Sequence, residues 1–276
     1  MKPTRKTLTP EDYRAHDGIS NSTLLAAANN PGDVIWALKA PRDVTKSVAA
    51  DFGTALHTAI LEPEKFDDQV YVSSVAGRTT KTFGKEIEDN PDKIVLTESE
   101  VQQIKLMQAS GIAHPAFNSA TSIVNHVESC LFVHDDAFNL DLKIRPDLDS
   151  VELDGMLTNL KTTASLDDWR SDRHWINPLF KFNYGHDAAY SLYVASKFYG
   201  RELTSYRFAV LQKSVSFGRY PVGVFTITKR ELIELGFWEE MLTNLRKFAD
   251  CYHTDQWLFE ESFPMFGDSI EVSEVE

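Results

Sequence analysis

Cysteine and long hydrophobic segments are scarce in this chain of 276 residues. Its two cysteines, Cys130 and Cys251, cannot make a disulfide framework, a thiolate zinc site or a redox pair at their spacing. No apolar run approaches the roughly 18 residues that span a bilayer, and no apolar segment follows the basic N-terminus as in a signal peptide. We therefore expect a soluble, unexported protein of the reducing cytoplasm, without a membrane partner.

Common nucleotide-binding and hydrolase motifs are absent as well. The chain has no P-loop, no Gly-x-Gly-x-x-Gly, no Gly-x-Ser-x-Gly elbow and no His-Glu-x-x-His helix. Glycine and proline occur in ordinary numbers, with 13 and 11 residues. Hydrophobic residues make up 42% of the chain and charged residues 25%. These values exclude a collagenous, low-complexity or wholly disordered chain and predict a globular protein with a sizeable core.

Basic residues are fewer than acidic residues. The chain has 41 Asp and Glu against 28 Lys and Arg, for a formal net charge of −13. This balance argues against a protein that coats nucleic acid with its whole surface, because long-range repulsion opposes such binding. It does not exclude a DNA enzyme whose basic residues are confined to a groove or a central channel.

The organisation of the chain indicates one domain. The length fits one large or two small domains, and there is neither an internal repeat nor a linker rich in Gly, Ser or Pro. We expect a flexible arm at residues 1–18, a single domain at residues 19–266 and an acidic tail at residues 267–276. Ser20 precedes a Leu/Ala run as an N-cap, so the first part of the domain is predicted to be mostly helical.

Hydrophobic periodicity and capping residues predict the individual elements. Predicted helices cover residues 19–28, 34–38, 51–61, 97–107, 166–175, 184–199 and 229–252, and a polar loop covers residues 77–85. Predicted strands cover residues 69–72, 123–133, 138–145, 156–161, 205–211 and 222–228. We expect the strands between residues 123 and 161 to form a three-stranded meander, and the fold class to be α/β.

The densest polar feature lies on the second and third strands of this meander. Asp147 follows one strand, and period-two alternation places Asn159 and Lys161 on the same face of the next. A hairpin turn would bring that face beside Asp147, where a carboxylate and a lysine suit a hard divalent cation and a water. In the alternative interpretation, Lys161 is a strand-edge lysine, Asp147 forms a turn and Asn159 is a solvated polar residue.

Four segments of the chain resemble one nuclease family. They are Asp51–Pro63 with the sequence DFGTALHTAILEP, Arg145-Pro146-Asp147, Leu160–Ala164 with the sequence LKTTA, and the helix that carries Ala188 and Tyr190. Their order and separations resemble the RecE (exonuclease VIII) branch of the PD-(D/E)XK nucleases. The resemblance implies a restriction-endonuclease-like core, in which a mixed sheet is flanked by helices.

The resemblance also implies an activity and its partners. The expected enzyme is a magnesium-dependent exonuclease that degrades one strand of linear double-stranded DNA from 5′ to 3′, with Mn²⁺ able to substitute for Mg²⁺. It leaves a 3′ single strand for an annealing protein of RecT type, and a homo-oligomeric ring is expected. Metal ions held by carboxylates neutralise charge on the attacked phosphate and lower the pKa of a bound water.

Site residues follow from the resemblance position by position. The implied catalytic residues are Asp147, Lys161, Glu128, Tyr190 and His186, and the implied metal-site residues are His57, Glu128, Asp147, Asn159 and Leu160. From the residues alone, His57 is better explained as a core histidine on an Ala/Leu helix. By the same standard, Glu128 can be a residue of an alternating strand that faces solvent.

Two departures from the family pattern lie in the implied site. The pattern has Asp or Glu two residues before the lysine, where this chain has Asn159, and Gln four residues before the tyrosine, where this chain has His186. An amide can contact a hard cation, but it removes one negative charge and so weakens metal binding. The alternative function is therefore a catalytically silent protein of the same fold that binds DNA ends or recruits a partner.

Cations for DNA phosphates are expected in three segments. The candidates are Arg78, Lys81 and Lys85 in the polar loop, Arg170 and Arg173 after the motif, and Lys213 and Arg219 beyond it. Such contacts depend strongly on salt and little on base sequence, which suits an exonuclease. In the alternative interpretation, about half of these side chains are ordinary solvated charges.

Overall fold

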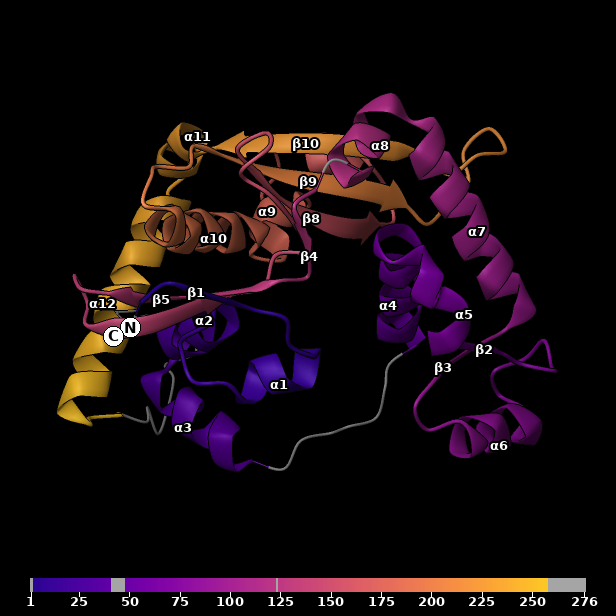
Figure 1. Cartoon of the computed structure of the whole chain (residues 1–276), viewed down its shortest axis with the longest axis horizontal. Helices are drawn as coiled ribbons and strands as arrows, with labels where there is room; N and C mark the ends of the chain where they lie inside the picture. The colour runs from indigo at the N-terminus through magenta and orange to yellow at the C-terminus, as the bar shows by residue number, and fades with distance from the viewer. Residues whose placement is uncertain (1, 41–47, 123, 258–276) are drawn as a thin grey trace, which may run out of the picture.

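A mixed five-stranded sheet forms the centre of the molecule (Figure 1). The computed structural model describes residues 2–40, 48–122 and 124–257. In sheet order the strands are β10 (Val222–Thr228), β9 (Ser205–Gln212), β8 (Met156–Thr163), β7 (Leu148–Ser150) and β4 (His126–Val127). β8 and β9 run parallel, whereas the other pairs run antiparallel. The expected mixed-sheet α/β fold is therefore confirmed.

The predicted meander divides between two sheets. β5 (Cys130–Asp135) and β6 (Leu140–Ile144) pair antiparallel as expected, but they form a sheet with β1 (Thr4–Lys6), whereas β8 pairs with β7. The prediction of a single three-stranded meander was therefore wrong. Pro146 follows β6, and because proline lacks a backbone donor and restricts the preceding residue, the chain leaves the first sheet there. This break places Asp147 between β6 and β7.

The N-terminal segment packs against the domain. The expectation of a flexible arm at residues 1–18 was therefore wrong for the residues that form a strand and a helix there. β1 pairs with β5, and α1 (Pro10–Ala15) follows. The Arg5 guanidinium donates hydrogen bonds to Ser129 at 2.6 Å and to Asp149 at 2.9 Å. The Asp149 side chain is 0% exposed, so Arg5 supplies the countercharge that its burial requires. A three-residue strand carries too little hydrophobic pattern to be found in the sequence.

Replacement of Arg5 by alanine tests this attachment. We expect Arg5→Ala to lower the free energy of unfolding by about 3 kcal/mol, because it leaves the Asp149 carboxylate buried without a countercharge. Urea denaturation followed by circular dichroism measures the change. Arg14→Ala, which removes an exposed arginine from the same segment, is the control and should change stability by less than about 0.5 kcal/mol. Equal free energies of unfolding for the two variants would contradict the role of Arg5 as the countercharge of Asp149.

The helical N-terminal portion is present as predicted, and the structure adds α6 (Lys81–Asp89), α8 (Pro115–Ser122) and β3 (Ile94–Leu96), which were not expected. Its helices are α2 (Asn21–Asn29), α3 (Pro31–Lys39), α4 (Val48–Leu61), η1 (Pro63–Lys65), α5 (Phe66–Gln69), α6, α7 (Glu98–Ala113) and α8. Ser20 caps α2, and Thr97 with Glu100 forms the capping box of α7. The polar loop expected at residues 77–85 instead becomes α6 from Lys81 onward, because the Thr80 hydroxyl accepts a hydrogen bond from the Phe83 N–H. Parallel strands β2 (Val70–Val72) and β3 flank α6 in the sequence.

The C-terminal half also follows the prediction in outline. It contains η2 (Asp167–Arg170), α9 (Pro178–Lys181), α10 (Tyr184–Tyr199), α11 (Lys229–Glu234) and α12 (Phe237–Thr254). The helix expected at 166–175 is only the short turn η2, so that expectation was wrong. The helix expected at 229–252 is divided at Gly236, whose φ of 86° lies in the left-handed region that interrupts a helix. The acidic tail expected at 267–276 lies outside the described residues.

Two hydrophobic cores cover the two faces of the central sheet. Tyr190 of α10 and Met241 of α12 belong to the first core, and Leu56 of α4 and Ile104 of α7 belong to the second. The neighbouring β8 residues Asn159 and Leu160 therefore face opposite layers, as strand alternation requires. Among the described residues, no helix combines the length and apolarity needed to cross a bilayer.

Candidate metal centre

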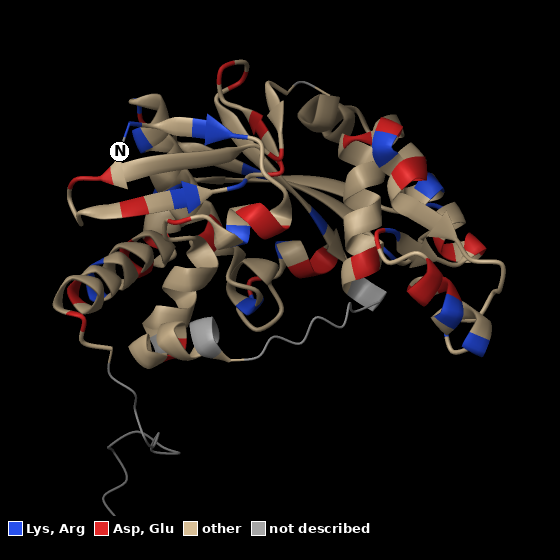
Figure 2. Cartoon of the chain, turned by 60° about the horizontal axis from the view of Figure 1, so that its bottom comes forward, with Lys and Arg blue, Asp and Glu red and all other residues tan. Residues whose placement is uncertain are grey.

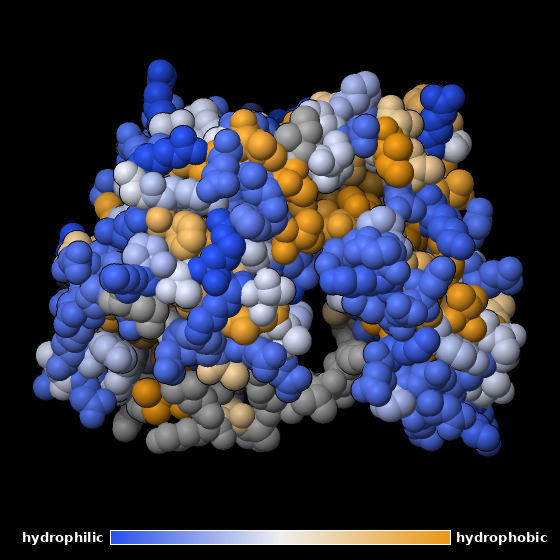
Figure 3. Space-filling view, in the orientation of Figure 1, coloured by the Kyte–Doolittle hydropathy of each residue, from blue (hydrophilic) through white to orange (hydrophobic). Residues whose placement is uncertain are grey.

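A cleft of about 560 Å³ lies beside α4. It is lined by Pro10, Ala50, Gly53, Thr54, His57, Thr58, Leu61, Glu62, Gln69, Glu128, Arg145 and Asp147. In Figure 3 the surface is hollowed between the part that carries α1 and the part that carries α4. The cleft is therefore open to solvent, and elements that are far apart in the sequence contribute to its walls.

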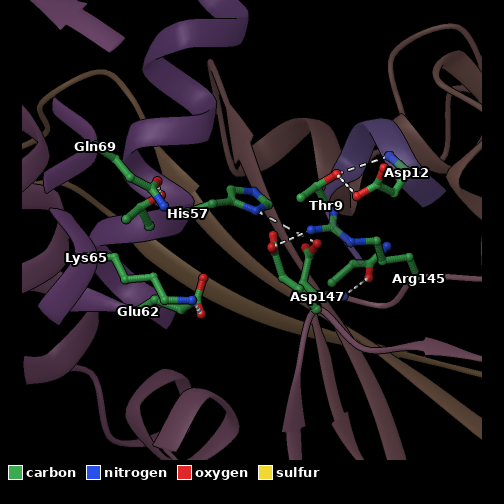
Figure 4. Close-up of polar contacts among 11 residues, drawn as sticks. Thr9, Asp12, His57, Glu62, Lys65, Gln69, Arg145 and Asp147 are labelled. Carbon is green, nitrogen blue, oxygen red and sulfur yellow. Dashed lines mark hydrogen bonds and ion pairs between the residues drawn. The ribbon is translucent and has the colours of Figure 1, made fainter. Parts of the chain in front are cut away.

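His57, Glu128 and Asp147 converge in this cleft. Each residue offers one ligand atom, and these atoms all lie within 4.8 Å of one another. The His57 Nδ1 atom lies 3.8 Å from Asp147 Oδ1. Figure 4 shows His57 reaching from α4 toward Asp147, with Arg145 on the other side of the carboxylate. Ala55 and Leu56 are buried, so His57 occupies the edge of the helix face that packs on the core.

Hydrogen bonds to the main chain hold Asp147 in place. Its Oδ2 atom accepts a hydrogen bond from the Leu160 N–H at 2.7 Å, and its own N–H donates to Asn159 Oδ1 at 3.2 Å. The Asp147 carbonyl accepts a hydrogen bond from the Glu128 N–H at 2.8 Å. Three segments of the chain are thus joined at Asp147, and the carboxylate has a fixed orientation toward His57.

Glu128 combines an unusual backbone conformation with a close countercharge. Its φ is 47°, in the left-handed region, which costs a residue other than glycine on the order of 1 kcal/mol and is often retained at functional sites. Arg145 Nη2 donates to Glu128 Oε2 at 2.6 Å. Burial raises the pKa of the Glu128 carboxyl, with Arg145 lowering it and the charge of Asp147 raising it. A divalent cation would favour the ionised form of both carboxyls.

Asn159 and Lys161 lie on the same face of β8 as predicted, and both are close to α10. Asn159 is 8% exposed, and its Nδ2 atom donates to Asp187 Oδ2 at 3.2 Å. The Lys161 ammonium lies 4.7 Å from the centre of the Tyr184 ring. Burial raises the pKa of the Asp187 carboxyl, the charge of Lys161 lowers it, and Asp147 raises it further. These shifts show that β8 and α10 share one charged environment with Asp147.

His186 and Tyr190 are buried and, like Asn159 and Lys161, are not among the residues that line the cleft. Both are 0% exposed. His186 Nδ1 lies 2.6 Å from Asn21 Oδ1 and its Nε2 lies 3.1 Å from Asn244 Nδ2, while the Tyr190 hydroxyl donates to the Ile19 carbonyl. Burial lowers the pKa of His186 to about 4, so this imidazole is neutral at pH 7. The two side chains join α10 to α2 and α12 inside the protein.

The predicted DNA-binding cations differ in their availability. Arg78 donates to Glu100 at 2.8 Å and packs over the Phe83 ring, so its charge is already paired. Lys81 and Lys85 are exposed on α6, and Arg170 and Arg173 are exposed in or after η2. In the view of Figure 2, Lys and Arg residues alternate with Asp and Glu. Arg170 also pairs with Asp167 at 3.5 Å, although it is exposed. Lys81, Lys85 and Arg173 are therefore accessible to a phosphate, whereas Arg78 is a structural residue.

Sequence reasoning missed two charged residues near the centre. Arg145 was part of a recognised motif but had no assigned role, although it contacts Glu128 and its buried Nε atom has no hydrogen-bond partner. Asp187 had no direct signal, because helical periodicity does not show that its carboxylate contacts Asn159. The adjacency of Asp187 to the suspected His186 was the only available indication.

The donor set fits a hard divalent cation. Two carboxylates and one imidazole are suitable ligands for Mn²⁺, and carboxylates with water are typical of Mg²⁺ sites. The three donor atoms are close enough to share one ion and remain accessible from the cleft. The neighbouring Asn159 amide adds an oxygen but no negative charge.

Asp147→Asn tests the metal centre. The amide keeps an oxygen that accepts from the Leu160 N–H, but it removes a charged ligand, so we expect Mn²⁺ affinity to fall by at least about tenfold. Isothermal titration calorimetry on the metal-free protein measures the affinity. Asp67→Asn, an exposed aspartate outside the cleft, is the control and should retain the original affinity. Unchanged binding in Asp147→Asn would rule out Asp147 as a ligand.

Comparisons with known proteins inform the fold. No protein-family model matches the chain, and no curated protein matches its sequence. A crystal structure from Eubacterium rectale, described as that of a "Putative exonuclease", matches with a TM-score of 0.60 and 16% sequence identity. The match covers 97% of this chain and 100% of the other. The two chains therefore share a fold over almost their whole lengths.

Proposed function

We propose that this protein is a metal-dependent exodeoxyribonuclease that degrades one strand from the ends of linear double-stranded DNA, from 5′ to 3′. The observation that carries the proposal is the convergence of His57, Glu128 and Asp147 beside the strand that holds Asn159 and Lys161. The fold shared with a structure described as that of a "Putative exonuclease" supports the same conclusion. Mg²⁺ is the proposed cofactor, and Mn²⁺ is expected to substitute.

Each charged residue has a distinct task in the proposed reaction. His57, Glu128 and Asp147 would hold the metal, and the Asn159-Leu160 segment lies directly beside Asp147. A divalent cation held there would provide a Lewis acid to offset charge on the phosphate and lower the pKa of a water. Because the cleft is open to solvent, a DNA end can approach the carboxylates directly.

Arg145, which lines the cleft, and Lys161 of β8 are the proposed sources of positive charge. The Arg145 guanidinium already contacts Glu128 and lines the cleft, where its charge can face a phosphate. Within the part of the chain that the structure describes, no ion pair involves the Lys161 ammonium, which leaves its N–H groups available. Lys161 is proposed to orient the attacking water or to stabilise charge that develops on the phosphate.

The polarity and the partners of the enzyme rest on its resemblance to RecE. Removal of the 5′ strand leaves a 3′ single strand, which is the substrate of an annealing protein of RecT type. A homo-oligomeric ring in the cytoplasm would confine the accessible cations around the DNA and would reconcile DNA binding with the net charge of −13.

The proposal is tested with linear duplexes labelled at the 5′ or the 3′ end and with a closed circular duplex. We expect the 5′ label to be released as mononucleotides or short fragments in Mg²⁺ or Mn²⁺, and EDTA to stop the release. The circular duplex should stay intact, since it has no end. Cleavage of the circle, or release of the 3′ label first, would contradict the proposed polarity and end dependence.

Lys161→Ala separates chemistry from binding. We expect the rate of hydrolysis to fall by about a hundredfold or more, because the charge beside the reacting phosphate is lost. Binding of duplex DNA, measured by fluorescence anisotropy in Ca²⁺, should change little, since one cation among several contributes modestly to affinity. Lys105→Ala, an exposed lysine on α7, should leave both quantities unchanged. Normal cleavage by Lys161→Ala would remove Lys161 from the mechanism.

A second candidate function is a catalytically silent protein that binds DNA ends or recruits a partner. Asn159 favours it, because an amide stands where the family pattern has an acid. This candidate predicts that DNA binds and no label is released in either metal. Metal-dependent release by the natural sequence decides against it.

A further inference from the structure

We infer that Asp187 supplies the negative charge that position 159 lacks, so that Asn159 and Asp187 form an exchanged acid–amide pair beside the metal centre. This inference rests on the proposed function and concerns how its metal site keeps its charge. Asp187 lies 28 positions after Asn159 in the sequence, on α10, next to His186 in the helix that resembles the nuclease family, and the resemblance implies no role for it.

The orientation of the Asn159 amide is determined by its two partners. The Asp147 N–H can only donate, so it must meet the amide oxygen, and it does so at 3.2 Å. An ionised Asp187 carboxylate can only accept, so it must meet the amide nitrogen, which lies 3.2 Å from Oδ2. An asparagine satisfies both contacts at once, whereas an ionised aspartate has no donor for Asp187.

An aspartate at position 159 would therefore conflict with Asp187. Two carboxylates at this separation repel each other, and Asp147 adds a third negative charge nearby. With asparagine at 159, the charge of Asp187 is compensated from two directions. Burial raises the pKa of the Asp187 carboxyl, and two features oppose this effect. Asp187 lies in the first turn of the 16-residue helix α10, where the helix dipole favours an anion, and the charge of Lys161 also favours the ionised form.

Asp187 acts through Asn159 and not as a ligand. Among the described residues, the group of side chains able to share one ion contains His57, Glu128 and Asp147 but not Asp187. Its carboxylate fixes the amide whose oxygen binds the Asp147 N–H, and its charge adds to the potential at the site. Residues in such outer positions commonly change metal affinity by about 10- to 100-fold when they are replaced.

A double-mutant cycle tests the pair. Asn159→Asp, Asp187→Asn and the double variant are compared with the natural sequence for Mn²⁺ affinity by isothermal titration calorimetry. In the natural background, Asp187→Asn should weaken binding by about tenfold or more. In the Asn159→Asp background, the same change should leave binding unchanged or strengthen it, because the amide at position 187 then donates to the new carboxylate. Weakening by the same factor in both backgrounds would overturn the inference.

Two further measurements separate a failure of the Asn159–Asp187 inference from a failure of the proposed metal site. Asp172→Asn removes an exposed aspartate and should have the same small effect in both backgrounds, which controls for general charge loss. For metal-free protein at pH 7, Asn159→Asp should lower the Tm and the double variant should restore it. If none of the variants binds Mn²⁺, the proposed function fails, while the Tm values still decide the pair. Equal Tm values for Asn159→Asp and the double variant would refute it.

Discussion

The hydrogen bond between the Leu160 N–H and the Asp147 carboxylate is the contact on which the candidate site depends. It ties the irregular segment after β6 to β8, and the Asp147 carbonyl in turn holds the Glu128 backbone. His57 then reaches the same carboxylate from α4, which packs on the opposite face of the sheet from α10. A site built on strands and a packed helix has little freedom to rearrange, as proposed metal chemistry requires.

The local charge of the site contrasts with the charge of the whole chain. Carboxylates gather around Asp147 in a protein that is already acidic, and burial raises the pKa of both Glu128 and Asp187. The charge of Arg145 opposes this rise at Glu128, and the charge of Lys161 opposes it at Asp187. A site of this kind holds its charges at a cost in stability, and a divalent cation would relieve that cost.

The accuracy of the sequence predictions depended on how local the signal was. The Ser20 N-cap and the helix expected at residues 184–199 depend on neighbours within a few turns, and the structure contains both. His186 and Tyr190 were misplaced because their partners come from α2, α12 and the segment before α2. A polar residue in a helix can be buried when distant groups satisfy it, and no spacing reveals those groups.

The sequence by itself determined the mixed α/β class, most element positions and the candidates Asp147, Asn159 and Lys161, because periodicity and capping act over a few residues. Only the tertiary structure decided which charges meet. Arg5 and Asp149 are 144 positions apart and Asn159 and Asp187 are 28 apart, yet each pair is in hydrogen-bond contact. Such contacts depend on how whole elements pack, since burial of a charge is tolerated only where folding brings its partner.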